Sequence, residues 1–444
     1  MECMEESIAM RKVICFLLSI CLLVGCSQSE LGGRKPLNDD SVIEIPEIIE
    51  KPYHEGYPPI DPVRLHVEPA VTLENTMLRN LTIYFTDAEY QLSKTQSATA
   101  KVTIGDILNA ATTIELFGNS TLECAKRPLK VKFEEKQSLG DGGKKFYLIS
   151  NIYDKTLLHN YVVFELARYM EGGFYVPMCE FVNVYATCDG QEGSGYQGVY
   201  LLAEKIEQND FASYDLKYVF EQDYRVYYDD PENGVEGEDW FWMGENYLAC
   251  FAVSGETSKE IVSDIKVRLE YIWKIICEKD WNKIQQYVDV ENIAKSFLLD
   301  DLVKDPDVGQ TSLYWGIKED GKLCIASIWD NDLSFGCGDM GKANRDLLSL
   351  NNVIFAGLYA VPEFKEFYGQ YFIAHCDEWR EYINQTIDGV SAEYFDDLQN
   401  DYINWERQYN WCNEDMRTLE YIEQIEYMKE WLGIRTDFLK EQLA

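Results

Sequence analysis

The stretch GKLCIASIWDNDLSFG, residues 321–336, places an apolar run directly before two acidic residues. Together with the preceding SLYWGIKED it predicts a β-hairpin that turns at residues 319–321. In an extended segment Asp330 and Asp332 would point to the same side, and Gly336 would let the chain turn away. Paired carboxylates of this kind suit Mg²⁺, although a D-x-D at a strand end is also common in solvated turns.

Composition sets the class of protein. The chain has 444 residues, of which 46% are hydrophobic and 14% aromatic, and this indicates a globular protein of one or two domains. It carries 40 basic against 77 acidic residues, a formal net charge of -37. Such an excess of negative charge opposes binding to nucleic acids and to anionic lipid surfaces, so we expect no nucleic-acid partner.

The N-terminus has the features of a targeting segment. Arg11 and Lys12 precede VICFLLSICLLVG, which is too short to span a bilayer and has the size of a signal-peptide core. The run ends in LVGC, which resembles the lipobox of bacterial lipoproteins. We therefore expect residues 1–25 to be a signal peptide and Cys26 to be acylated, with an ordinary signal peptide as the alternative. The protein would then be exported and anchored by lipid to a bacterial membrane, at the outer membrane or cell surface.

Cysteine usage predicts no zinc site. Of 13 cysteines, those at 3, 15, 21 and 26 belong to the targeting segment, and the others are scattered without a CxxC or a Cys/His cluster. Cys179 and Cys188 flank one predicted strand, so they are too far apart to form a disulfide. We expect mostly buried thiols.

Hydrophobic patterning predicts a tether followed by one large domain. Residues 26–72 contain prolines and acids without a sustained period and read as the tether, which leaves 73–444 as the domain. Residues 77–220 are rich in predicted strands, and the chain after 255 is mainly helical. The β-rich runs are NLTIYF, TTIELF, LKVKF, FYLIS, EFVNVYAT and GVYLLAE.

One helix interrupts these strands, at residues 156–170, with Asp154 as its expected N-cap. The predicted fold is therefore α+β and bilobal, with a β-rich lobe at 77–220 and a mainly helical lobe at 221–444. This is the order of elements in a protein kinase. The acidic aromatic segment 223–243 suits either a partner-facing loop or a solvated insertion.

Two glycine-containing motifs fail on chemistry. SLGDGGKK resembles a phosphate loop, but that motif needs glycine at Ser138 and a hydroxyl at Lys145, so we interpret it as a turn between strands. DNDLSFGCGD begins like a calcium-binding loop, yet Phe335 replaces the required glycine and Gly341 the required glutamate. An EF-hand is excluded.

Six segments, in order along the chain, are similar to the CotH family of kinase-like proteins, typified by the spore-coat protein H. They cover roughly residues 77–440. The resemblance implies an atypical protein-kinase-like fold that binds ATP and Mg²⁺; some members phosphorylate proteins, and others are surface proteins whose enzymology is unproven. The segments are FGNSTLECAKRPLKVKF, NIYDKTLLHNYVVFELAR, GYQGVYLLAEKIE, DDLVKDPDVGQTSLYW, GKLCIASIWDNDLSFG and MKEWLGIRTDFL.

The resemblance assigns roles to the acidic residues. Asp330 would bind the metal, with Asp332 as a further candidate ligand. Asp307, 23 residues before Asp330, matches the catalytic-loop aspartate that accepts or orients the proton of the substrate hydroxyl. Asp305 stands where relatives are expected to have asparagine, which leaves the second metal ligand open.

The resemblance also implies a nucleotide site in the β-rich lobe. Strand alternation puts Lys130 and Lys132 on one face, and Lys130 is the expected ATP contact. The turn at Gly118, Asn119 and Ser120 would cover the phosphates through backbone N–H groups.

Two glutamates complete the expected nucleotide site. Glu165 lies mid-helix between apolar neighbours, where an unpaired charge is costly, and is the candidate partner of Lys130. Glu204, at the expected hinge between lobes, would contact adenine, Lys130 or surface Lys205.

Three departures from the family pattern leave activity open. Phe117 and His159 stand where the family has arginine, and Cys337 where it has asparagine, so each is expected to remove a polar contact. We therefore carry two functions: an ATP- and Mg²⁺-dependent phosphotransferase acting on a protein or other hydroxyl acceptor, and a surface binding, adhesion or structural lipoprotein that keeps the fold without turnover.

Overall fold

The computed structural model describes residues 61–65, 76–140, 142–191, 193–207, 211, 213–226, 239–243, 246–255, 257–307, 309, 311–338, 344–405, 413, 416 and 418–444. All of them belong to one unit of the chain, Gly56–Ala444. The predicted signal peptide, Cys26 and most of the predicted tether lie outside the described residues. No helix in the described ranges is long and apolar enough to cross a bilayer.

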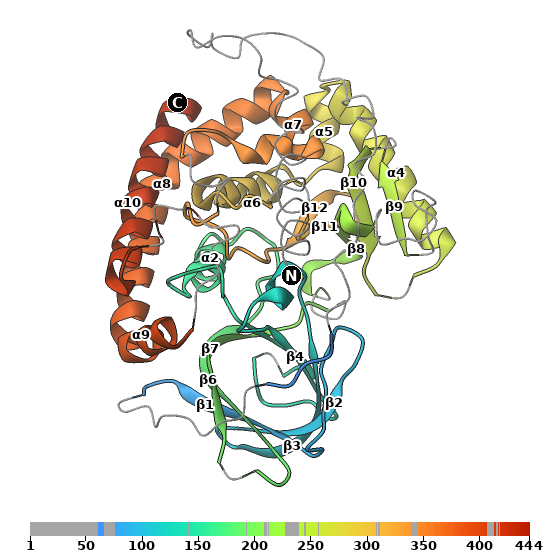
Figure 1. Cartoon of the computed structure of the whole chain (residues 1–444). Helices are drawn as coiled ribbons and strands as arrows, with labels where there is room; N and C mark the ends of the chain where they lie inside the picture. Colours follow the sequence, from blue (N-terminus) through green and yellow to red (C-terminus); the bar gives the residue numbers. More distant parts are fainter. Residues whose placement is uncertain are drawn as a thin grey trace, which may run out of the picture. The chain divides into compact units, whose positions relative to one another are not determined.

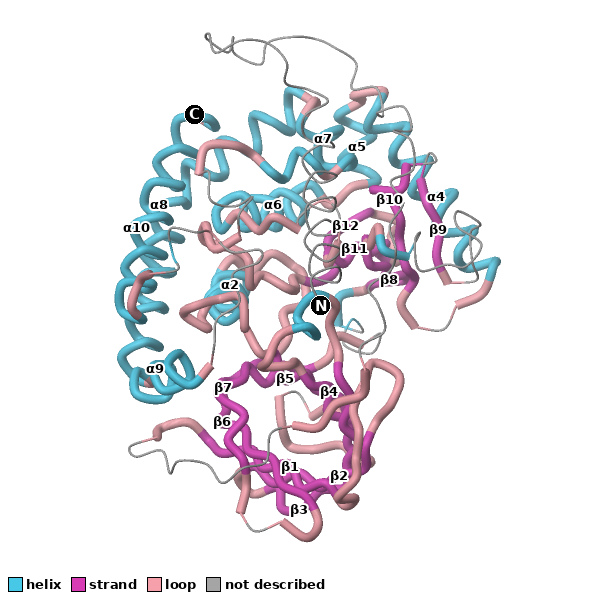
Figure 2. Tube along the Cα trace, viewed as in Figure 1, coloured by secondary structure: helices cyan, strands magenta, loops and turns pink. Residues whose placement is uncertain are grey.

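Seven strands close into a barrel in the first part of this unit, as Figures 1 and 2 show. The strand order is β1-β2-β3-β4-β5-β7-β6, and a parallel pairing of β6 with β1 closes it. Buried and exposed positions alternate in β2 and β4, so apolar side chains on one face of these strands fill the barrel. The strands are β1 (Arg79–Phe85), β2 (Ala98–Ile104), β3 (Ile107–Leu116), β4 (Leu129–Phe133), β5 (Lys145–Ile149), β6 (Cys179–Cys188) and β7 (Gly195–Glu204). The predicted β-rich runs are confirmed.

Part of the predicted tether packs on this barrel. The backbones of Val63 and Leu92 exchange two hydrogen bonds, of 3.0 and 2.9 Å. Leu65 is buried among the barrel side chains, and its N–H donates to the Tyr90 hydroxyl at 3.1 Å. The tether prediction is therefore wrong for residues 61–65, because so short a pairing leaves no periodic pattern in the sequence.

The helix inserted between β5 and β6 is α2 (His159–Tyr169). Its N-cap is Leu158, so the prediction of Asp154 as the N-cap residue is wrong. The Asp154 carboxylate nevertheless accepts hydrogen bonds from the N–H groups of Thr156, at 2.8 Å, and His159, at 2.7 Å. It thus satisfies a donor at the start of the helix from five residues upstream.

A second sheet has the strand order β12-β11-β8-β10-β9. The predicted hairpin is confirmed as β11 (Leu313–Lys318) and β12 (Leu323–Ser327), with Gly321 at a φ of 90° in its turn. The lobe boundary predicted at about 220 falls within β8 (Leu216–Gln222), which pairs with β11. β8 therefore belongs to the sheet that carries the hairpin.

The acidic aromatic segment ends in a buried strand. β9 (Trp240–Met243) pairs with β10 (Asn246–Val253), and the side chains of Trp240, Phe241 and Met243 are buried. This part of 223–243 is therefore not a solvated insertion, whereas residues 227–238 lie outside the described ranges.

Helices dominate the chain after residue 255, as predicted. At their centre is α6, whose residues from 292 to 303 are all buried, as expected of a helix surrounded by other elements. It packs against α2, α8 and α10, which lie around it in Figure 1. The helices are α4 (Lys259–Cys277), α5 (Trp281–Tyr287), α6 (Val290–Val303), α7 (Val353–Tyr359), α8 (Pro362–Glu393), α9 (Phe395–Asn404) and α10 (Tyr421–Leu443), with the short 3-10 helices η1 (Ser120–Glu123) and η3 (Leu348–Asn351).

Helix α9 attaches the helical part to the barrel through two buried aspartates. Asp397 accepts a hydrogen bond of 2.7 Å from the Asn183 side chain on β6. Asp401 forms an ion pair of 2.9 Å with Lys126, and neither side chain is exposed. Asp401 also accepts from the N–H of Val199 on β7, at 2.7 Å.

The described cysteines are free, as predicted. Cys179 and Cys188 stand at opposite ends of β6. Six of the eight described thiols are buried, namely Cys124, Cys188, Cys250, Cys324, Cys337 and Cys376.

Candidate active site

The loop that follows α6 carries Asp305 and Asp307. α6 ends at Val303, and Lys304 then adopts a left-handed backbone with a φ of 54°. Asp305 is buried, and its Oδ1 accepts a hydrogen bond from the N–H of Asp307 at 2.8 Å. Its Oδ2 accepts from Ser334 Oγ at 3.2 Å, so Asp305 joins this loop to the segment after β12.

Asp330 follows β12 in a strained conformation. Its φ is 63°, a left-handed value that costs residues other than glycine about 1–2 kcal/mol. Oδ2 of Asp330 accepts a hydrogen bond from Ser312 Oγ at 3.2 Å, and the N–H of Asn331 donates to Asn160 Oδ1 at 2.7 Å. The segment is therefore not extended, and the alternation that would point Asp330 and Asp332 to one side does not hold.

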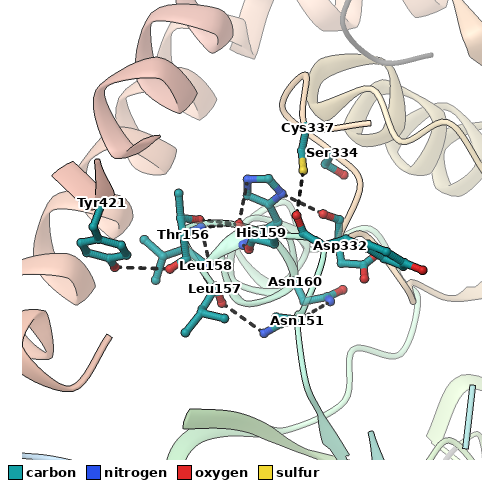
Figure 3. A network of polar contacts seen from close by, with 12 residues as sticks. Asn151, Thr156, Leu157, Leu158, His159, Asn160, Asp332, Ser334, Cys337 and Tyr421 are labelled. Carbon is teal, nitrogen blue, oxygen red and sulfur yellow. Dashed lines mark hydrogen bonds and ion pairs between the residues drawn. The ribbon is translucent and has the colours of Figure 1, made fainter. Parts of the chain in front are cut away.

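Figure 3 shows how the turn that contains Asp332 is held against α2. His159 is buried, with Nδ1 at 3.0 Å from the Asp332 carbonyl oxygen and Nε2 at 3.3 Å from Oδ1 of Asp154. Cys337 Sγ donates to the Tyr153 carbonyl at 3.2 Å. His159 and Cys337, which were expected to remove polar contacts made by the family's residues, make polar contacts of their own.

The two acidic loops line one pocket. Asp307 and Asp330 are thus brought together, whereas Asp332 is not among the described residues of the lining. The lining is Asp300, Asp305, Asp307, Thr311, Ser312, Leu313, Ile328, Trp329, Asp330 and Asn331.

Four acidic side chains of the described residues line this pocket, of which Asp300 and Asp305 are buried and Asp307 and Asp330 half-buried. Burial, and then the charge of Asp330, raises the pKa of Asp307 to about 6. Burial also raises the pKa of Asp330, and it raises the pKa of Asp305 and of Asp300 well above the ordinary range. Carboxylates held in this way are stabilised in their charged form by a bound cation.

The donor atoms of the pocket suit Mg²⁺. Its polar lining consists of carboxylate, hydroxyl and amide oxygens, which are hard ligands, and Oδ2 of Asp300 is buried without a hydrogen-bond partner in the described part of the chain. No three Asp, Glu, His or Cys side chains of the described residues form a ready-made metal site. Mg²⁺ at nucleotide sites uses one or two carboxylates together with phosphates and water, and Asp330 fits that pattern.

A known protein family matches the part of the chain that contains this pocket. The family described as CotH kinase protein matches residues 114–439, well over half of the chain. The chain belongs to the CotH kinase protein family. The resemblance found in the sequence is thereby confirmed, and the matched range begins within β3, so β1 and β2 precede it. A search of curated proteins found no match.

In this member of the CotH family, Lys130 lies on the face of β4 that points away from the barrel core. It forms an ion pair with Glu115 on β3, and its register partner on β5 is Tyr147. The Tyr147 ring lies 4.2 Å from that of Phe117 and 5.5 Å from that of Trp329. Trp329 lines the acidic pocket, so this row of rings connects the surroundings of Lys130 with the acids.

The turn Gly118–Ser120 leads into η1. Gly118 has a φ of 93°, and Oδ1 of Asn119 accepts a hydrogen bond of 2.8 Å from Lys94. Ser120 begins the 3-10 helix, and Cys124 follows it. Burial and, to a smaller extent, the charge of Asp332 raise the pKa of Cys124 to about 11, which places this turn near the Asp332 turn.

Two predicted nucleotide contacts have other partners. Glu165 pairs with Arg168 of its own helix and Lys130 with Glu115, so the predicted Lys130–Glu165 pair is not formed. The Arg168 guanidinium, one helical turn away, provides a local counter-charge for the Glu165 carboxylate. The Glu204 carboxylate is buried against Gly140 and Gly143, at positions where a Cβ would contact it.

Ser312, Asp223 and Arg225 were not predicted as site residues. Arg225 Nε lies 2.7 Å from Oδ1 of Asp223, and its Nη2 donates to Thr311 Oγ1 at 2.5 Å. The sequence predicted the hairpin without a register, and it is the pairing of Tyr314 with Ser327 in the structure that brings Ser312 near Asp330. No local sequence pattern links Arg225 to the pocket, because its partner Thr311 follows it by 86 positions.

Proposed function

We propose that this chain is a kinase-like phosphotransferase that binds ATP with Mg²⁺ and transfers the γ-phosphoryl group to a hydroxyl of a protein or other acceptor. The observation that carries the proposal is the meeting of Asp307 and Asp330 in one pocket, on the loop after α6 and the end of β12. Membership of the CotH kinase protein family supports it.

Each acid has a separate task in this chemistry. Bound Mg²⁺ would neutralise charge on the β- and γ-phosphates. Asp330, oriented by Ser312, would hold it. Asp307 would accept the hydroxyl proton as the acceptor oxygen bonds to the γ-phosphorus and the bond to the β–γ bridging oxygen breaks. Its pKa of about 6 suits a base that works near neutral pH.

The proposal extends to the fold and the location. The barrel and the helical part would act as the two lobes of a kinase-like fold, with Lys130 and the Gly118–Ser120 turn on the nucleotide side.

The protein would be exported and held at a bacterial membrane through lipid on Cys26. Replacing Cys26 by alanine should release it from membranes, and continued membrane retention of that variant would contradict the anchor.

One observation favours the alternative of a binding, adhesion or structural protein without turnover. The lysine–glutamate pair expected of an active kinase is not formed, because Lys130 and Glu165 have other partners.

Nucleotide binding separates the two functions. Mg-ATP should raise the unfolding temperature of the full-length chain, because a ligand that binds only the folded state stabilises it, by about 2.7 kcal/mol at a hundredfold excess over Kd. ATP with a chelator and Mg²⁺ alone are the controls, and neither should reproduce the shift. The absence of any shift at millimolar Mg-ATP would support the protein without turnover.

A further inference from the structure

An arginine stands next to the acidic pocket, just beyond the end of β8. Its backbone N–H and its Nε both donate to Oδ1 of Asp223, at 2.9 and 2.7 Å. Nη2 donates to Thr311 Oγ1 at 2.5 Å, and Thr311 Oγ1 lies 3.3 Å from Oδ1 of Asp223. Asp223 and Thr311 therefore fix the plane of the Arg225 guanidinium from two sides.

The positive charge of Arg225 reaches the two acids proposed for phosphoryl transfer. It acts to lower the pKa of both Asp307 and Asp330, against the larger effect of burial. It also lowers the pKa of Glu221, which burial raises to about 7. Arg225 thus stands within electrostatic range of the place where a γ-phosphate between Asp307 and Asp330 would lie.

The fixed geometry of the Arg225 guanidinium suits the binding of an anion better than it suits a role as counter-ion to the acids. Asp223 contacts the Nε side of the guanidinium and Thr311 its Nη2, while Nη1 makes no hydrogen bond to a described residue. A guanidinium is planar, always charged and able to bind phosphate oxygens with two N–H groups. An arginine supplied within the same chain can stabilise charge on a phosphoryl group in transfer.

We propose that Arg225 is a catalytic residue that binds the γ-phosphoryl oxygens during transfer, an inference that rests on the proposed function. The bond changes remain those given above: the acceptor oxygen bonds to phosphorus, the bond to the bridging oxygen breaks, and the proton goes to Asp307. Arg225 keeps its protons throughout and donates hydrogen bonds to the equatorial oxygens. Asp223 acts through Arg225 as a positioning residue.

The test compares Arg225→Met and Arg225→Lys with wild type in the full-length chain. Arg268→Met is the matched control: Arg268 also pairs with an aspartate, Asp264 at 3.0 Å, but unlike Arg225 it makes no hydrogen bond to a described residue of the pocket lining. Three quantities are measured for each protein: the Kd of Mg-ATP, the Kd of Mg-ADP, and single-turnover transfer from γ-labelled ATP. Unfolding temperatures establish that each variant is folded.

Arg225→Met should lose the preference for Mg-ATP over Mg-ADP and slow transfer by about 10³-fold, the lower range for an arginine of this kind. Arg225→Lys should recover part of the preference but little of the transfer, because a point charge lacks the planar pair of donors. Arg268→Met should match wild type in all three.

An unchanged ATP-to-ADP preference and unchanged transfer in Arg225→Met would overturn the inference and leave Arg225 as a counter-ion of the acids. The same result in Arg225→Lys alone, should the methionine variant not fold, would overturn it as well. Failure of the proposed function itself looks different, because wild type would then bind no Mg-ATP or would bind it without transferring label.

Discussion

Ser312 and Asp330 both line the pocket and are joined by a hydrogen bond of 3.2 Å from Ser312 Oγ to Oδ2 of Asp330. Both have left-handed backbones, with φ values of 59° and 63°. Strain of this kind costs about 1–3 kcal/mol per residue and persists where surrounding contacts impose it, often at functional sites. The carboxylate proposed to hold Mg²⁺ is therefore kept in place at a cost to stability.

Replacing Asp330 by glycine should stabilise the metal-free protein while removing its function. Glycine adopts the left-handed conformation without strain, and the change also removes a half-buried carboxyl group, so we expect the free energy of unfolding at pH 7 to rise by about 1 kcal/mol. Mg²⁺-dependent nucleotide binding should be lost. Urea unfolding and calorimetric binding measure the two effects.

Asn331→Gly is the control for that substitution, because Asn331 is buried and has no positive φ. It should destabilise the protein. Equal destabilisation by both glycine substitutions would show that the Asp330 backbone is not strained.

The stability of the metal-free protein should fall as pH rises from about 4 to 6. The pKa of Asp307 is raised from 3.8 to about 6, so in this window the folded state binds a proton that the unfolded state has released. The stabilisation is complete below pH 3.8 and is lost as pH rises through 6. Asp307→Asn should flatten this part of the profile of unfolding temperature against pH. Superimposable profiles for wild type and Asp307→Asn would refute the raised pKa.

The buried pair Lys126–Asp401 should show strong coupling. Asp401→Asn leaves the Lys126 ammonium buried without a counter-charge, which we expect to cost about 3–5 kcal/mol of stability. Adding Lys126→Met should restore most of the loss, because no buried charge then remains. A double-mutant cycle in urea measures the coupling, and additive effects would contradict it.

Lys130, but not Glu165, should matter for nucleotide binding. Lys130→Met should weaken Mg-ATP binding by about tenfold, which corresponds to the loss of one charge-assisted hydrogen bond. Glu165→Gln should leave Kd unchanged, because Glu165 pairs with Arg168 in the structure. Titration of both variants with a fluorescent ATP analogue tests this, and a loss of affinity in Glu165→Gln would restore the pairing predicted from sequence.

Local patterns predicted the elements of this fold well, and contacts distant in sequence explain what they missed. The alternation in LKVKF identified β4, and the β-rich run beginning at Leu323 identified β12. The same alternation rule failed at Asp330, because its backbone is set by partners distant in sequence, Ser312 and, through Asn331, Asn160. No local pattern could show that a β6–β1 pairing closes the barrel.

The candidate site was predicted to a similar extent. Asp307 and Asp330 were proposed from the family resemblance of two separate segments, and the structure brings them into one pocket. Arg225 was missed because its role depends on contact with Thr311, which follows it by 86 positions. The Lys130–Glu165 pairing failed because each charge has a nearer partner.

Transfer of label from γ-labelled ATP tests the central claim most directly, with the full-length chain and a generic protein acceptor. Wild type should transfer label only when Mg²⁺ is present. Asp307→Ala should bind Mg-ATP as wild type does yet transfer at least about a hundredfold more slowly, the lower range for removal of a general base. Asp330→Ala should neither bind Mg-ATP nor transfer. Wild-type binding without any transfer, or transfer unchanged in Asp307→Ala, would contradict the account.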